Sequence, residues 1–131
     1  MPREESHYPE DWFRVGRKEL KRAERLLEMK DLDGAAFNLQ QAAEKFFKGY
    51  LLSKGWELRR IHDLEPLLNE ALRYDPSLEE LRAGCLKLTD YYIEERYPFV
   101  GESGLKRNEV EESLTMVKRL IAKITGNKKS D

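Results

Sequence analysis

The chain has 131 residues, of which 40% are apolar and 37% are charged. This length and this apolar content suit a single domain with one core. The 24 lysines and arginines nearly balance the 25 aspartates and glutamates, which gives a formal net charge of −1. The balance argues against a strongly basic nucleic-acid-binding protein taken as a whole, although it leaves room for a local basic face.

The single cysteine, Cys85, excludes an intramolecular disulfide and favours a reducing compartment. It lies at helical spacing from Leu81 and Leu88, which favours a buried small side chain over a nucleophile. No apolar run approaches the roughly 20 residues that a membrane helix needs. The N-terminal sequence MPREESHYPEDW does not resemble a signal peptide. We therefore expect a cytoplasmic protein without membrane contact.

Apolar residues recur at helical spacing in five segments. The first helix extends from about Pro9 to Lys30, and basic residues crowd its surface outside the apolar face. The second begins near Asp33, a residue type that caps helix N-termini, and runs to Lys54. Gly55 then ends it, because glycine is favoured just past a helix C-terminus. The apolar face of this second helix consists of Ala35, Ala36, Leu39, Ala42, Ala43, Phe46, Phe47, Tyr50 and Leu51.

Two helices are predicted in the next part of the chain. Asp63 can cap a third, shorter helix over about 63–74, which an Asp-Pro dipeptide ends. Ser77 and Glu80 then have the spacing of a capping box, which predicts the start of a fourth helix. That helix should end before Pro98, since the residue before a proline is disfavoured in the helical conformation.

Asn108 and Glu111 repeat the capping-box spacing at the start of a fifth helix, which Gly126 ends. No segment has the alternating pattern of a strand, and short connections favour antiparallel neighbours. The sequence therefore predicts an all-α fold. We expect an up-and-down four-helix bundle from the first, second, fourth and fifth helices, with the short third helix across one end. One domain should cover residues 1–131, with a core over about 9–126 and a frayed tail at 127–131.

Polar residues gather first on the second helix, where Gln41, Glu44, Lys45 and Lys48 share one face. The two lysines could contact phosphates. Alternatively, this face is solvated and carries a Glu44–Lys48 pair worth a few tenths of a kcal/mol. The pattern by itself favours the solvated face.

A second place is the segment RRIHDLEPLL, in which His62 precedes the predicted cap Asp63. The helix N-terminus together with Arg59 and Arg60 could bind an anion, and His62 could titrate near neutral pH. Alternatively, the imidazole packs on the bundle or bonds a backbone carbonyl, and the local sequence favours this second interpretation.

A third place is the segment YYIEERYPFVG, which gathers Tyr91, Tyr92, Arg96, Tyr97 and Phe99. An arginine among aromatic rings can hold a base by stacking and a phosphate by a bidentate contact. The same composition suits a protein interface equally well. The chain has no glycine-rich phosphate loop, and one cysteine with two histidines cannot supply a Cys/His metal site.

Together the strings AAFNLQQAAEKFFKGYLLSKG, HDLEPLL and YYIEERYP resemble the HEPN family, the higher eukaryote and prokaryote nucleotide-binding domain. The family pattern Q-A-A-E-K-x-x-K-x-x-L is matched by residues 41–51, its His-Asp-Leu by 62–64, and its Arg-Tyr-Pro by 96–98. The similarity extends from about Trp12 to Ile124. It implies a bacterial or archaeal helical bundle that forms homodimers and pairs with a small nucleotidyltransferase, often as a toxin–antitoxin system.

Other members of the family are ribonucleases that use an Arg-x4-6-His motif at the dimer interface, and this chain departs from that motif. Its histidines are His7 and His62, none follows Arg96 within six residues, and Arg59 and Arg60 precede His62 too closely. RNA cleavage without a metal needs a general acid or base, usually histidine. The resemblance therefore implies a fold and a partner more than a nuclease, and we expect no catalysis by the chain alone.

Three hypotheses remain. In the first, the chain is a homodimeric subunit that binds a nucleotidyltransferase and a nucleotide such as ATP. The ligand contacts would then be Lys45, Lys48, His62, Asp63, Arg96 and Tyr97. In the second, it is a toxin ribonuclease with RNA as substrate and a non-standard site of His62 and Arg96. In the third, it is a dimeric scaffold without a ligand.

Overall fold

The computed structural model describes the backbone of residues 6–96 and 104–126 and the side chains of residues 6–90 and 104–126. Within these residues the chain is helical and contains no strand. The helices are α1 (Pro9–Glu28), α2 (Leu32–Ser53), α3 (Leu64–Leu72), the 3₁₀ helix η2 (Pro76–Leu81), α4 (Arg82–Arg96) and α5 (Arg107–Thr125). The prediction of an all-α fold with five α-helices is confirmed over the described residues. The predicted tail at 127–131 lies outside them.

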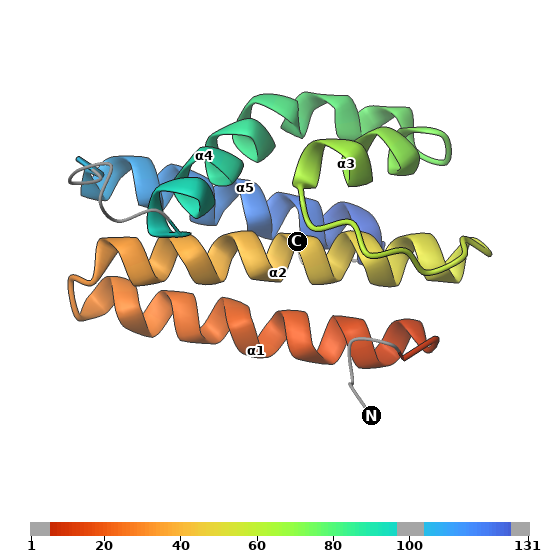
Figure 1. Cartoon of the computed structure of the whole chain (residues 1–131), viewed down its shortest axis with the longest axis horizontal. Helices are drawn as coiled ribbons and strands as arrows, with labels where there is room; N and C mark the ends of the chain where they lie inside the picture. The colour runs from red at the N-terminus through yellow and green to blue at the C-terminus, as the bar shows by residue number, and fades with distance from the viewer. Residues whose placement is uncertain (1–5, 97–103, 127–131) are drawn as a thin grey trace.

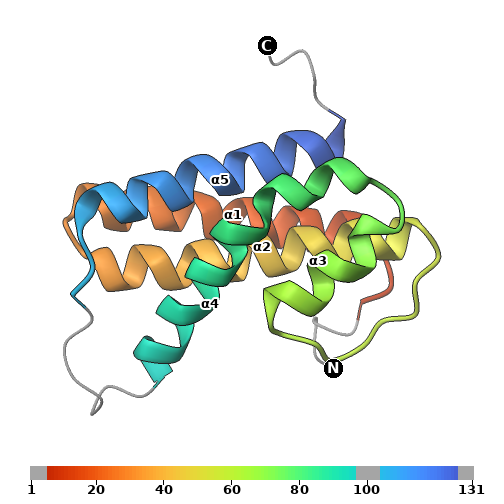
Figure 2. The same ribbon diagram turned by 90° about the horizontal axis from the view of Figure 1, so that it is seen from above.

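Helix α2 is the centre of the bundle (Figure 1). It contacts α1 on one side and α3, α4 and α5 on the other, whereas α1 lies at the edge of the molecule. The four long helices alternate in direction, as predicted. Figure 2 shows that α4 crosses α2 and α5 obliquely, and that α3 lies beside it over the C-terminal half of α2.

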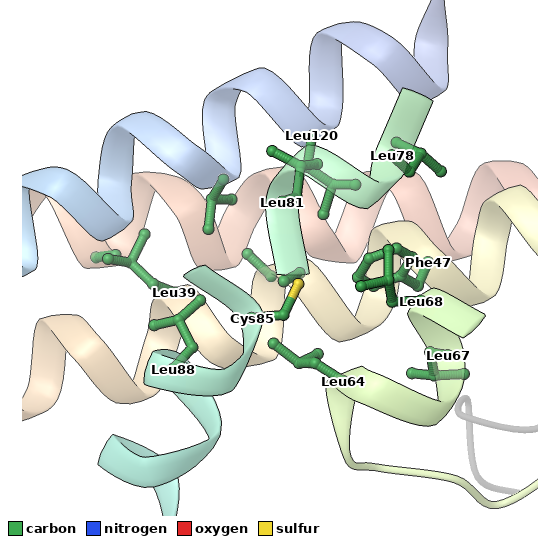
Figure 3. Packing of buried hydrophobic residues seen from close by; sticks show 14 of the residues in the cluster. Leu39, Phe47, Leu64, Leu67, Leu68, Leu78, Leu81, Cys85, Leu88 and Leu120 are labelled. Atoms are coloured by element: carbon green, nitrogen blue, oxygen red, sulfur yellow. The ribbon is translucent and has the colours of Figure 1, made fainter. Parts of the chain in front are cut away.

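The core is built from leucines and alanines of all the helices, together with Phe47 and Cys85 (Figure 3). Leu39 and Phe47 of α2 face Leu64, Leu88 and other leucines that come from α3, η2, α4 and α5. Cys85 is fully buried in this cluster. Burial raises the pKa of its thiol to about 12, so the predicted structural role of this cysteine is confirmed.

Two glycines let α1 and α2 approach closely. A Cβ atom on Gly16 would lie 2.7 Å from the Phe46 ring, and one on Gly49 would lie 2.6 Å from the Phe13 ring. The two rings stack on each other with centroids 5.5 Å apart. Each helix thus supplies a phenylalanine that fills the space left by a glycine of the other, which fixes the position of α1 on α2.

One predicted helix start is wrong, and a second predicted cap lacks its hydrogen bond. Helix α2 is capped by Asp31 and not by Asp33, because the Asp31 carboxylate accepts a hydrogen bond from Gly34 N at 2.9 Å. Asp63 does stand at the N-cap of α3, but its side chain makes no capping hydrogen bond. When two aspartates lie two residues apart, the sequence alone does not determine which side chain accepts the capping hydrogen bond.

The two predicted capping boxes are also wrong in position. Asp75 accepts from Ser77 N at 3.1 Å, and the residues after it form η2, so α4 begins only at Arg82. At α5 the Glu109 carboxylate accepts from Lys106 N at 3.1 Å, ahead of the predicted pattern of Asn108 and Glu111. In both places a neighbouring acidic residue makes the bond instead.

Candidate functional site

The polar face of α2 contains a buried ion pair. The Glu44 carboxylate accepts from Lys48 Nζ at 3.0 Å, and each side chain is only 4% exposed. The predicted Glu44–Lys48 pair is therefore present, but the interpretation of this face as solvated is wrong. Two opposite charges one helical turn apart are expected on a surface, and their burial here implies that tertiary contacts replace the lost water.

The cover over this pair comes from α1. The Lys48 ammonium lies 5.5 Å from the centre of the Trp12 ring, and Trp12 itself is buried. An aromatic face attracts a cation, most strongly where water is excluded. The Glu44 carboxylate and the Trp12 indole together stabilise the buried ammonium of Lys48.

His62 binds the same carboxylate from another part of the chain. Its Nδ1 lies 2.8 Å from Glu44 Oε2, while the imidazole remains 61% exposed. An ionised carboxylate only accepts hydrogen bonds, so Nδ1 carries the proton and Nε2 is the acceptor of the neutral ring. The local interpretation, in which the ring packs or bonds a backbone carbonyl, is replaced by a bond to a side chain of α2.

Gln40 extends this network along α2. Its side chain is fully buried, and its amide donates to the carbonyl oxygen of His62 at 3.1 Å. Gln41 donates to the Gln40 side chain at 2.7 Å and accepts from Lys45 at 3.3 Å. The segment before α3 is therefore fastened to α2 by both the backbone and the ring of His62.

A hollow of about 630 Å³ opens where α1 passes the middle of α2. It is lined by Ser6, Asp11, Trp12, Arg14, Val15, Glu19 and Lys45. Lys45 Nζ lies 3.4 Å from Glu19, and the two side chains are 15% and 16% exposed. Burial raises the pKa of the Glu19 carboxyl even though the Lys45 ammonium beside it acts to lower it.

The predicted site residues are only partly brought together. Lys48 and His62 meet at Glu44, and Asp63 follows His62 at the exposed N-cap of α3. Lys45 instead lines the hollow beside α1. Arg96 is the last residue of α4, but its side chain lies outside the described part, as do the side chains of Tyr91 and Tyr92. Tyr97 and Phe99 lie outside the described residues altogether.

Sequence reasoning missed the contacts of three residues with the predicted site: Trp12 with Lys48, Glu19 with Lys45, and Gln40 with the His62 carbonyl. Gln40 had a usable signal, because it follows Ala36 by four residues and precedes Ala43 by three on the apolar face. A glutamine at such a position is expected to be buried and bonded. The contacts of Trp12 and Glu19 gave no local signal, since their partners lie on another helix.

The described residues suggest neither a metal site nor a membrane span. No three His, Cys, Asp or Glu side chains among residues 6–90 and 104–126 are grouped to hold a metal ion. None of the helices in the described part of the chain is long and apolar enough to traverse a bilayer.

Comparisons with known proteins agree with this fold. A family model of the HEPN domain matches residues 9–128. The chain is similar to a solved crystal structure, that of TT1696 from Thermus thermophilus, with 31% sequence identity and a TM-score of 0.79. The similarity covers 90% of this chain and 96% of that chain. A search of curated proteins finds no significant match. Because the family model spans nearly the whole chain, including α2 with its Glu44–Lys48 pair and the His62 segment, the chain belongs to the HEPN domain family.

Proposed function

We propose that this HEPN chain is a binding subunit that takes up a nucleotide and pairs with a small nucleotidyltransferase, as in a toxin–antitoxin module. The observation that carries the proposal is the hollow between α1 and α2. Two cations, Arg14 and Lys45, line it beside two carboxylates and the hydroxyl of Ser6. This mixture suits a nucleotide, whose phosphates need cations and whose base and ribose donors need acceptors.

The buried residues of α2 support the hollow and do not contact the ligand in this proposal. Lys48 and Glu44 hold Trp12, which forms part of the wall. Lys45 is placed for direct contact, because it lines the hollow and its bond to Glu19 is long, at 3.4 Å. Arg96 is not assigned to this hollow, because α4 and α1 lie on opposite sides of α2. Arg96 and Tyr97, which the family resemblance marks, stay predictions from the sequence.

Native mass spectrometry with ATP and other nucleotides tests this proposal. We expect a homodimer that takes up one ATP per chain, and a loss of uptake in Lys45→Ala. Lys54→Ala is the matched control, because Lys54 is an exposed lysine at the far end of α2. A folded protein that takes up no nucleotide would contradict the nucleotide part of the proposal and favour a dimeric scaffold.

A second candidate function is RNA cleavage at a non-standard site, and one observation favours it. The Glu44 carboxylate holds the His62 ring in a defined tautomer with much of the imidazole exposed, as a general base requires. Incubation of the protein with a structured RNA, beside His62→Asn, tests this function. Cleavage that His62→Asn abolishes would establish it, whereas intact RNA with folded protein would end it.

A further inference from the structure

The outward face of α1 has four cations in one row, Arg14, Lys18, Lys21 and Arg25, which we call the basic stripe. All four are exposed. Their spacing of three or four residues places them on one side of the helix. At 1.5 Å per residue the stripe is about 16 Å long. Because α1 lies at the edge of the bundle, no other described helix covers this side (Figure 1).

Most of the stripe lacks an internal counter-charge. Lys18, Lys21 and Arg25 have no carboxylate partner among the described residues, and Arg14 makes only an exposed pair with Asp11 at 3.1 Å. A shallow hollow of about 480 Å³ runs along the first half of the stripe, lined by Glu10, Arg14, Arg17, Lys18 and Lys21.

Two acidic residues of α1 point elsewhere. Glu19 pairs with Lys45 of α2, and Glu24 pairs with Lys118 of α5 at 3.0 Å. The fold thus separates opposite charges that are mixed along the sequence of this helix. Cations stay on the outer face, whereas Glu19 is mostly buried against α2 and Glu24 is directed toward α5 in an exposed pair.

The two ends of the stripe limit what can bind there. Exposed carboxylates, Glu10 and Glu28, stand at its two ends and would repel a long phosphate backbone that continued past them. Exposed apolar side chains also stand at both ends, Tyr8 at 71% and Met29 at 72%. Tyrosine, methionine and arginine are the residue types enriched at protein interfaces relative to the rest of a protein surface.

We propose that the basic stripe docks an acidic helix of a different protein, with carboxylates spaced three and four residues apart against Lys18 and Lys21. This rests on the proposed function and deepens it by assigning the surface that meets the protein partner. Opposite charges at such spacing select the partner and its register. The length of the stripe corresponds to about three turns of the opposing helix.

The probe is a labelled alanine-rich helical peptide of about 20 residues, long enough to be helical, with glutamates along one face. A second peptide has the same composition with the glutamates distributed around the helix. Fluorescence anisotropy at low salt compares their affinities for the wild-type chain, for Lys18→Glu/Lys21→Glu and for the control Lys54→Glu/Lys87→Glu. The control changes the net charge equally at exposed positions outside α1.

We expect the one-faced peptide to bind at least about tenfold more tightly than the distributed one. Lys18→Glu/Lys21→Glu should remove that preference, and the control variant should keep it.

Equal binding of the two peptides, or an equal loss in both variants, would overturn the proposal. Tighter binding of an oligouridine through the same lysines would overturn it in favour of RNA. A change of oligomeric mass in Lys18→Glu/Lys21→Glu would overturn it in favour of self-association. Lys18 and Lys21 do not line the Lys45 hollow, so ATP uptake by this variant tests the nucleotide proposal separately.

Discussion

The Glu44 carboxylate on α2 lies 2.8 Å from Nδ1 of His62, a residue 18 positions later, just before α3. The same oxygen accepts from Lys48 at 3.0 Å. One buried carboxylate therefore pairs with Lys48 of the same helix and also binds His62 in the segment that connects α2 to α3. Its loss should affect both the stability of the bundle and the position of the His62 segment.

Glu44→Gln should lower the free energy of unfolding by about 3 kcal/mol, because it leaves the buried Lys48 ammonium without its counter-charge. Urea denaturation followed by circular dichroism measures this change. The matched control is Glu24→Gln, whose pair with Lys118 is exposed and should contribute no more than about 1 kcal/mol. Equal, small effects of the two substitutions would show that the Glu44 pair is not important for stability.

Gly16→Ala should destabilise the protein by about 1–3 kcal/mol, although alanine is the better helix former, because the new methyl group meets the rigid Phe46 ring. Gly84→Ala is the matched control. Its new methyl group meets Met116, whose flexible side chain can move aside, so the loss should be smaller. Thermal denaturation of the two variants compares them directly. A more stable Gly16→Ala variant would refute the close packing of α1 on α2.

The stability contributed by Glu19 should increase as the pH falls. Its pKa is raised in the folded chain by burial, so the folded state holds this proton more tightly than the unfolded state does. The contribution is therefore fully present below the unfolded pKa of about 4.5 and is lost as the pH rises through the folded value. Denaturation of wild type and Glu19→Gln between about pH 4 and pH 7 measures the difference, with Glu24→Gln as the exposed control. A difference that does not change with pH would contradict this prediction.

The Cys85 thiol should resist modification in the native state, since a pKa of about 12 leaves very little thiolate at about pH 8 and burial prevents access. An aromatic disulfide reagent with an absorbance readout should react with it only after denaturant is added. A Ser53→Cys variant provides an exposed thiol at the end of α2 and should react at once with one equivalent. Rapid modification of native wild type would mean that the core around α4 opens readily.

The sequence alone determined the fold class and the family, because both depend on local periodicity and on short strings. The apolar face predicted for α2 is buried in the core, and the spacing of Cys85 from Leu81 and Leu88 predicted its burial. That α2 is the central helix was not predicted. Helix starts were less well predicted. Asp31 and Asp33 are both suitable caps, and small differences in loop geometry select between them.

Only the tertiary structure decided what the polar residues of α2 do. The spacing of Glu44 and Lys48 predicts that they share a face, but not whether water or another helix covers it. That depends on Trp12 and His62, which approach from parts of the chain far away in sequence. In the same way, α1 carries charges of both signs along its sequence. Only the tertiary structure pairs Glu19 with Lys45 of α2 and Glu24 with Lys118 of α5, which leaves a basic outer face. Local periodicity determines where helices form and which residues share a face. Burial and charge pairing depend on contacts between segments that are far apart in the sequence.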